Sequence, residues 1–161
     1  MKYVVALFLA MVLLAVPGCG TKGEETGDLA KKIYEGSLQS SKTVKVYNHR
    51  EEPAFLAALY GEKEMPAVFS SVEDCAIVLS KNDSGFEIQI LKMRHLSQTR
   101  EGEQLLRQRL ELLQSAEMRR YLGDRYEDCI ASAIIYKKGL YVFLLATGEN
   151  NRAINKIEEI L

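Results

Sequence analysis

Residues 140–146 read Leu-Tyr-Val-Phe-Leu-Leu-Ala, and this stretch decides the fold. Its length and its run of apolar side chains are typical of a buried strand. A strand with one face in water alternates apolar and polar residues, whereas this one is apolar on both faces. At about 25 cal/mol per Å², exposing several such side chains would cost several kcal/mol, which is comparable with the stability of a whole domain. We therefore expect both faces of its sheet to be covered.

The neighbouring segments supply the other strands. Residues 130–137 precede the apolar stretch and join it through the tight turn Lys138-Gly139. Residues 75–80 and 86–93 flank a five-residue loop and predict an earlier hairpin, in which Phe86, Ile88 and Ile90 share one face. We predict a four-stranded antiparallel sheet built from two β-hairpins. With the strands numbered along the chain, the expected order in the sheet is 2-1-3-4.

Helices are predicted at residues 29–38, 53–61, 101–122 and 151–161 from apolar side chains spaced three or four residues apart. The fold class is therefore α+β: each hairpin is followed by a helix, and two short helices come first. We expect the long helix and the C-terminal helix to cover one face of the sheet. The two N-terminal helices are the favoured cover of the other face. A partner protein or a second copy is the alternative cover, and it would contact side chains such as Val142 and Leu144.

The first 18 residues predict a lipoprotein signal peptide. Met1-Lys2 is positively charged, and the uncharged run 3–16 is shorter than the roughly 20 residues that span a bilayer. Val16-Pro17-Gly18-Cys19 resembles the lipobox of bacterial lipoproteins, although Pro17 stands where Ala, Ser or Thr is more usual. The resemblance implies that a diacylglycerol is attached to Cys19 and that the chain is cut before it. An ordinary secretory signal or an uncleaved anchor is the alternative.

The predicted cleavage before Cys19 divides the chain into three parts. Residues 1–18 are the signal peptide, residues 19–27 are the lipidated cysteine with a Gly-rich flexible tether, and residues 28–161 form one extracytoplasmic domain. With 47% apolar and 27% charged residues, the composition is that of a globular protein and excludes extensive disorder. A net charge of −1 provides no overall field that would attract nucleic acid.

Three short patterns, together with the lipobox, resemble a family of small, mainly Gram-positive bacterial lipoproteins, domain of unknown function 4358. They are Leu59-Tyr60-Gly61, Tyr121-Leu122-Gly123-Asp124 and the last hairpin at residues 137–143. The resemblance covers residues 28–161. It implies the fold and a place at the outer face of the cytoplasmic membrane, and it carries over no catalytic residue.

The chemistry-bearing residues form no recognised site. His49 and His95 have no catalytic motif around them, and the sequence lacks the spacings of metal, phosphate-binding and redox motifs. We therefore expect no cofactor, no metal and no enzymatic activity. Cys75 and Cys129 are expected to form no disulfide, because the predicted strand order places them at opposite ends of the sheet.

Arg109 falls within the apolar arc of the helix predicted at 101–122. In one interpretation its stem packs on the sheet and its head reaches water or an acidic side chain. In the other, its guanidinium lies in a groove and binds an anion. The first interpretation is favoured, because it requires only that the head of Arg109 reach a nearby edge of the packed helix and sheet. The surrounding stretch 92–125 mixes basic and acidic residues, so its contact with anionic lipid would be too weak to anchor the domain alone.

The sequence thus predicts a lipid-anchored, non-catalytic binding or accessory module outside the cytoplasm. Its expected partners are the membrane, through Cys19, and either an envelope protein or a second copy through the sheet face. The candidate contact residues are Arg109, Val142 and Leu144. An envelope hydrolase or transferase with an unrecognised site is the alternative.

Overall fold

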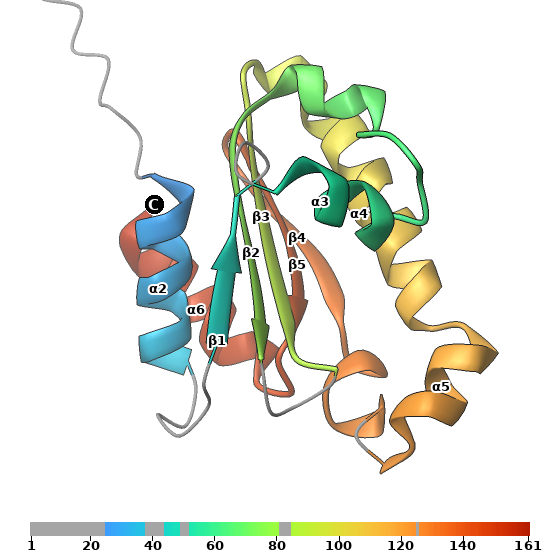
Figure 1. The fold of residues 1–161 in the computed structure, drawn as a ribbon. Helices are drawn as coiled ribbons and strands as arrows, with labels where there is room; N and C mark the ends of the chain where they lie inside the picture. Colours follow the sequence, from blue (N-terminus) through green and yellow to red (C-terminus); the bar gives the residue numbers. More distant parts are fainter. Residues whose placement is uncertain (1–24, 38–43, 49–51, 81–84, 125) are drawn as a thin grey trace, which may run out of the picture.

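The computed structural model describes residues 25–37, 44–48, 52–80, 85–124 and 126–161, so the predicted signal peptide, Cys19 and His49 lie outside the described residues. Its centre is an antiparallel sheet with helices on both faces (Figure 1). The strands are β1 (Val44–Tyr47), β2 (Val72–Ser80), β3 (Glu87–Met93), β4 (Ile134–Lys138) and β5 (Tyr141–Ala146). The α+β class is confirmed, but the sheet has five strands instead of four, because β1 pairs with the edge of β2.

The strand order is β1-β2-β3-β5-β4, so the expected order was wrong. Both predicted hairpins form, but they join through β3 and β5 instead of through their first strands. Ile88 lies opposite Leu145 and Ile90 lies opposite Phe143 in this pairing. The physical reason is that β5 is buried along its whole length, and an inner position between two strands also satisfies its backbone on both edges.

Five helices are present among the described residues: α2 (Thr26–Ser37), α3 (Pro53–Leu59), α4 (Thr99–Leu113), α5 (Ala116–Leu122) and α6 (Asn150–Ile160). The helix predicted at 101–122 is therefore two helices. The chain breaks at Ser115, whose extended backbone ends the first helix and whose side-chain oxygen accepts a hydrogen bond from the backbone N–H of Met118. A π-helical segment, η3 (Tyr126–Ile130), delays the start of β4 to Ile134.

Each face of the sheet has its own pair of helices (Figure 1). Side chains of α4 and the end of α3 pack on one face, and α2 and α6 pack on the other. The expected grouping was wrong, since α4 and the C-terminal helix lie on opposite faces. Val142 and Leu144 are fully buried on the α4 face, while Phe143 is fully buried on the other. The chain itself therefore covers both faces of β5.

The two cysteines are buried thiols, as expected, but for a different reason. Cys75 belongs to the core on the α4 face and Cys129 to the core on the α2 and α6 face. The sheet itself therefore separates them.

Helix α4 lies unusually close to the sheet at Gly102. A Cβ atom at this position would come within 2.8 Å of Met93 Sδ and 3.5 Å of Val142 Cγ2. The missing side chain therefore lets the first turns of α4 rest on β3 and β5. None of the helices in the described part of the chain combines the length and apolar character that crossing a bilayer demands.

Candidate functional site: a groove between η1 and α4

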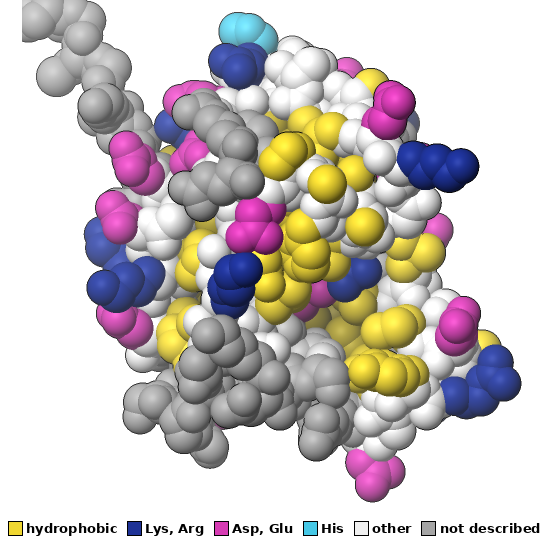
Figure 2. Space-filling model, in the orientation of Figure 1, with side chains coloured by type: hydrophobic (Ala, Val, Ile, Leu, Met, Phe, Trp, Pro, Cys, Tyr) yellow, Lys and Arg dark blue, Asp and Glu magenta, His cyan; other side chains and the backbone are white. Residues whose placement is uncertain are grey.

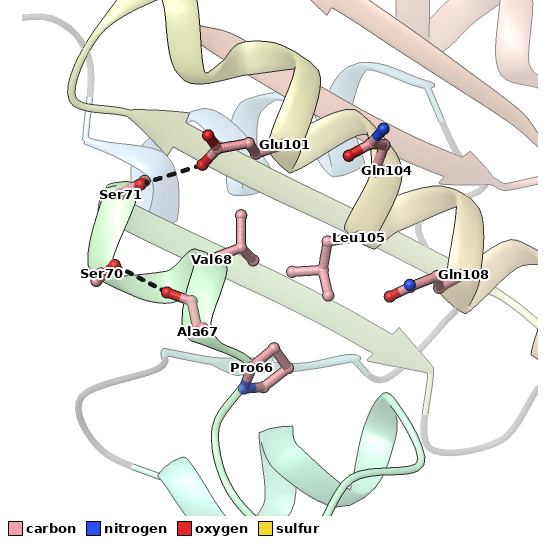
Figure 3. Close-up of a pocket in the computed structure, with 9 residues that line it drawn as sticks. All are labelled: Pro66, Ala67, Val68, Ser70, Ser71, Glu101, Gln104, Leu105 and Gln108. Atoms are coloured by element: carbon pink, nitrogen blue, oxygen red, sulfur yellow. Dashed lines mark hydrogen bonds between the residues drawn. The ribbon is translucent and has the colours of Figure 1, made fainter.

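A groove of about 360 Å³ lies between α4 and the 3₁₀ segment η1 (Ala67–Ser71) (Figure 3). Pro66 fixes the extended backbone before η1, and the short helix then carries Val68 toward α4. Val68 and Leu105 lie opposite each other across the groove, and both belong to or pack on the core of the α4 face. The floor of the groove is therefore apolar and continuous with the core.

The walls of the groove are polar and almost entirely uncharged. Gln104 and Gln108 are one helical turn apart on α4, and both are exposed. Among the described residues, neither amide has a hydrogen-bond partner. Across the groove, the Ser71 hydroxyl donates to Glu101 Oε2 at 3.3 Å and the Ser70 hydroxyl donates to the Ala67 carbonyl at 2.8 Å. Each amide offers both a donor and an acceptor to a ligand above the apolar floor.

A second depression of about 710 Å³ adjoins the groove and shares Pro66 and Ala67 with it. It is formed by the loop 61–67 between α3 and η1. Figure 2 shows this side of the molecule, on which hydrophobic side chains gather over α3 and around it. The two depressions together extend the concave surface along one side of η1. Such an open shape suits a chain segment better than a small molecule, which is usually enclosed on most of its surface.

A buried polar network lies beneath the same helix, centred on Arg109. Its Nε and Nη2 donate to the two carboxylate oxygens of Glu87 at 3.0 and 2.7 Å, and its Nη1 donates to the Leu59 carbonyl at 2.8 Å. Gln89 Nε2 donates to Glu87 Oε1, and the Tyr60 hydroxyl donates to Gln89 Oε1. The network therefore ties α4, β3 and the end of α3 together.

The electrostatics of this network keep Arg109 charged and Tyr60 neutral. Burial disfavours the charged form of Arg109, but the attraction and hydrogen bonds of Glu87 outweigh it and raise the pKa of the guanidinium. Burial, with the charge of Glu87 adding to it, raises the pKa of Tyr60 well above its usual value. Tyr60 therefore remains a neutral donor to Gln89.

The head of Arg109 thus reaches an acidic side chain, which is the first of the two interpretations of the sequence. Glu87 neutralises it, and neither of the two depressions is lined by Arg109. Val142 and Leu144 are buried, so none of these three predicted contact residues lies in the groove. His95 is exposed at the start of η2 (Leu96–Gln98). No cluster of three metal-ligating side chains occurs within the described ranges.

Sequence reasoning missed the groove residues because Gln104, Gln108 and the two serines are neutral and form no motif. The one available signal was the pair of glutamines at positions i and i+4 of a predicted helix. Comparisons of the chain with protein-family models, with curated proteins and with solved structures give no match.

Proposed function

We propose that this protein is a lipid-anchored, non-catalytic binding module at the outer face of the cytoplasmic membrane, and that the groove between η1 and α4 holds its ligand. The observation that carries the binding site is the pair of exposed amides, Gln104 and Gln108, above the apolar floor of Val68 and Leu105. The membrane location rests on the lipobox-like residues that end at Cys19.

The ligand that fits this groove is an extended segment of an envelope protein that is uncharged where it lies over the groove, while Glu62, Lys63 and Glu64 line the adjoining depression. The unpartnered amides match alternating backbone N–H and C=O groups, and the apolar floor matches a side chain between them. The groove and the adjoining depression share Pro66 and Ala67, which gives the concave surface the length that a chain segment requires.

Binding is favoured over catalysis by the chemistry of the lining residues. Glu101 is the one ionisable side chain among those that line the groove, and it accepts a hydrogen bond from Ser71. General acid–base catalysis on an envelope substrate generally needs a second positioned group within reach of the first. An envelope hydrolase or transferase remains the alternative function, and its site would lie elsewhere.

The ligand site is tested by site-specific photo-crosslinking in intact cells. A photoreactive amino acid replaces Gln104, and in the matched control it replaces Asn155, an exposed residue of α6 on the other side of the molecule. We expect one discrete protein adduct from position 104, weakened by Gln108→Ala, and none from position 155. Equal adducts from both positions, or none from position 104, would contradict the proposed ligand site.

The anchor is tested separately with a clickable fatty acid. Cys19→Ala is expected to abolish labelling and to leave an unprocessed precursor, because the thiolate accepts the lipid. A variant that is still processed and labelled normally would show that the lipoprotein interpretation is wrong.

A further inference from the structure

The end of the sheet at which α2 begins is the end closest to the proposed anchor. The backbone N–H and hydroxyl of Thr26 donate to Asp74 Oδ2 at 3.0 and 2.7 Å, which fixes the start of α2 beside the start of β2. Thr26 comes seven positions after Cys19, and seven residues span at most about 25 Å. A lipid on Cys19 would therefore hold this end of the domain near the bilayer.

The same end carries an exposed leucine on a well-supported turn. Figure 1 shows the segment after β3 at the upper end of the sheet, the end at which α2 also begins. Leu96 is 65% exposed there. Its turn is held by hydrogen bonds from Arg94 N to the Ser71 carbonyl at 3.0 Å and from Thr99 Oγ1 to the Leu96 carbonyl at 2.9 Å. A lone exposed leucine is ordinary on a protein surface, so its location is what is informative.

Two arginines lie close to this leucine in the chain, and Arg94 Nε donates to the Ser70 carbonyl at 3.2 Å. Arg94 and Arg100 are both exposed, and neither forms an ion pair with any described residue. Arg100 follows Leu96 by four positions, across the junction of η2 with α4, and both side chains are exposed. Acidic side chains also lie at this end: Glu101 follows Arg100 directly and accepts a hydrogen bond from Ser71, and Glu25 and Asp28 are exposed at the start of α2. Lys92 is paired with Glu73 at 2.9 Å. Figure 2 shows a histidine and a basic side chain projecting at the top of the molecule.

We propose that this surface docks on an anionic lipid bilayer, with Leu96 entering the headgroup region and the two arginines binding lipid phosphates. The surface, called the tether-end tip from here on, consists of Arg94, His95, Leu96 and Arg100. The proposal rests on the proposed lipid anchor. Each basic side chain near an anionic surface raises binding about fivefold, so the two arginines together contribute about 25-fold. That is weak for a protein free in solution, but the anchor makes docking an intramolecular step with a high effective concentration.

Docking at the tip would also orient the ligand groove. Ser71 supports the turn of Leu96 and lines the groove, and Glu101 follows Arg100 directly. One end of the groove therefore lies beside the tip and would face the lipid headgroups, while the depression formed by the loop 61–67 would point away from the membrane.

The test places an environment-sensitive dye on Ser97→Cys, an exposed position within η2, in full-length protein that has been expressed in membranes and reconstituted into vesicles. The matched control carries the dye on Tyr121→Cys, which is 77% exposed on α5 at the opposite end. Vesicles of phosphatidylglycerol are compared with vesicles of phosphatidylcholine. A parent protein without the added cysteine gives the background from Cys75 and Cys129, which are buried, and from Cys19 wherever it is not acylated.

We expect a blue-shifted, brighter signal at position 97 in anionic vesicles alone and no change at position 121. Arg94→Gln with Arg100→Gln should reduce the docked-to-free ratio about 25-fold, and Leu96→Ser should reduce it further. Equal signals at positions 97 and 121, or a signal at position 97 that is independent of lipid charge, would overturn the proposal. Fatty-acid labelling of the same preparation distinguishes failure of the docking proposal from failure of the lipid-anchor proposal. Acylated protein that does not dock contradicts only the proposed docking of the tether-end tip. Unacylated protein that does not dock contradicts the proposed lipid anchor on Cys19 as well.

Discussion

Replacing one residue of the buried ion pair between Arg109 and Glu87 should destabilise the protein more than replacing both residues with apolar ones. The pair is bidentate, and the side chains are only 14% and 3% exposed. In Glu87→Leu the guanidinium stays in the interior without its counter-charge. In Arg109→Met the carboxylate is left there in the same way. In the double variant neither charge remains, and apolar side chains occupy the space between β3 and α4.

The magnitudes follow from the cost of an uncompensated buried charge. Removing one partner of a buried pair costs about 3–5 kcal/mol, whereas replacing both by apolar groups is often close to neutral. The lost hydrogen bonds to the Leu59 carbonyl and from Gln89 add about 1–3 kcal/mol for each buried group left unsatisfied. Since a domain of this size is stable by about 5–15 kcal/mol, each single variant should lose a large part of its free energy of unfolding. The double variant should lose clearly less than the sum of the two.

Urea unfolding followed by circular dichroism at pH 7 measures these differences for the wild type, both single variants and the double variant. Glu103→Gln provides the control, because it removes two surface ion pairs, with Arg107 and with Lys137, and the loss of each should change the free energy of unfolding by less than about 1 kcal/mol. If the two single losses add up in the double variant, or if Glu87→Leu is as mild as the control, the reasoning about the buried charge is refuted.

Three further outcomes are expected. Burial disfavours the carboxylate of Asp74, but its hydrogen bonds outweigh this and lower its pKa below 3.8. The stability that Asp74→Asn removes should therefore be fully present above pH 3.8 and should vanish as the pH falls through the lower, folded-state pKa; a loss that is the same at pH 2 and pH 6 in urea unfolding would contradict this. Cys75 and Cys129 should react with a thiol reagent rapidly only after denaturation, so a fast reaction of the native protein would show that they are not buried. Gly102→Val should lower the free energy of unfolding by at least about 1–3 kcal/mol, because its Cβ would meet a buried sulfur at 2.8 Å. Gly27→Val, at a position with no neighbouring atom within 4 Å, should have a much smaller effect, and equal losses in thermal unfolding would refute the close-approach argument.

The candidate site could be predicted only in part from the sequence. Arg109 stood out because a charge interrupted an apolar arc, and the structure shows that its head reaches an acid. Its partner, Glu87, is 22 positions earlier, and no local pattern connects the two. The groove depends on how η1 sits against α4, and this contact joins segments that the sequence leaves unrelated. Polar side chains that belong to no sequence motif can be recognised as a candidate site only when tertiary packing brings them together.

The sequence by itself determined the local elements of this protein. Both hairpins and the burial of residues 141–146 on both faces follow from periodicity and from turn chemistry, which act over a few residues. The tight turn of the last hairpin lies at Gly139-Leu140, one position later than predicted. Only the tertiary structure decided that β5 pairs with β3, that α4 and α6 lie on opposite faces, and that β1 completes the sheet. Each of these choices joins distant segments whose apolar faces are compatible with several partners, and the free energy of the whole core selects among them.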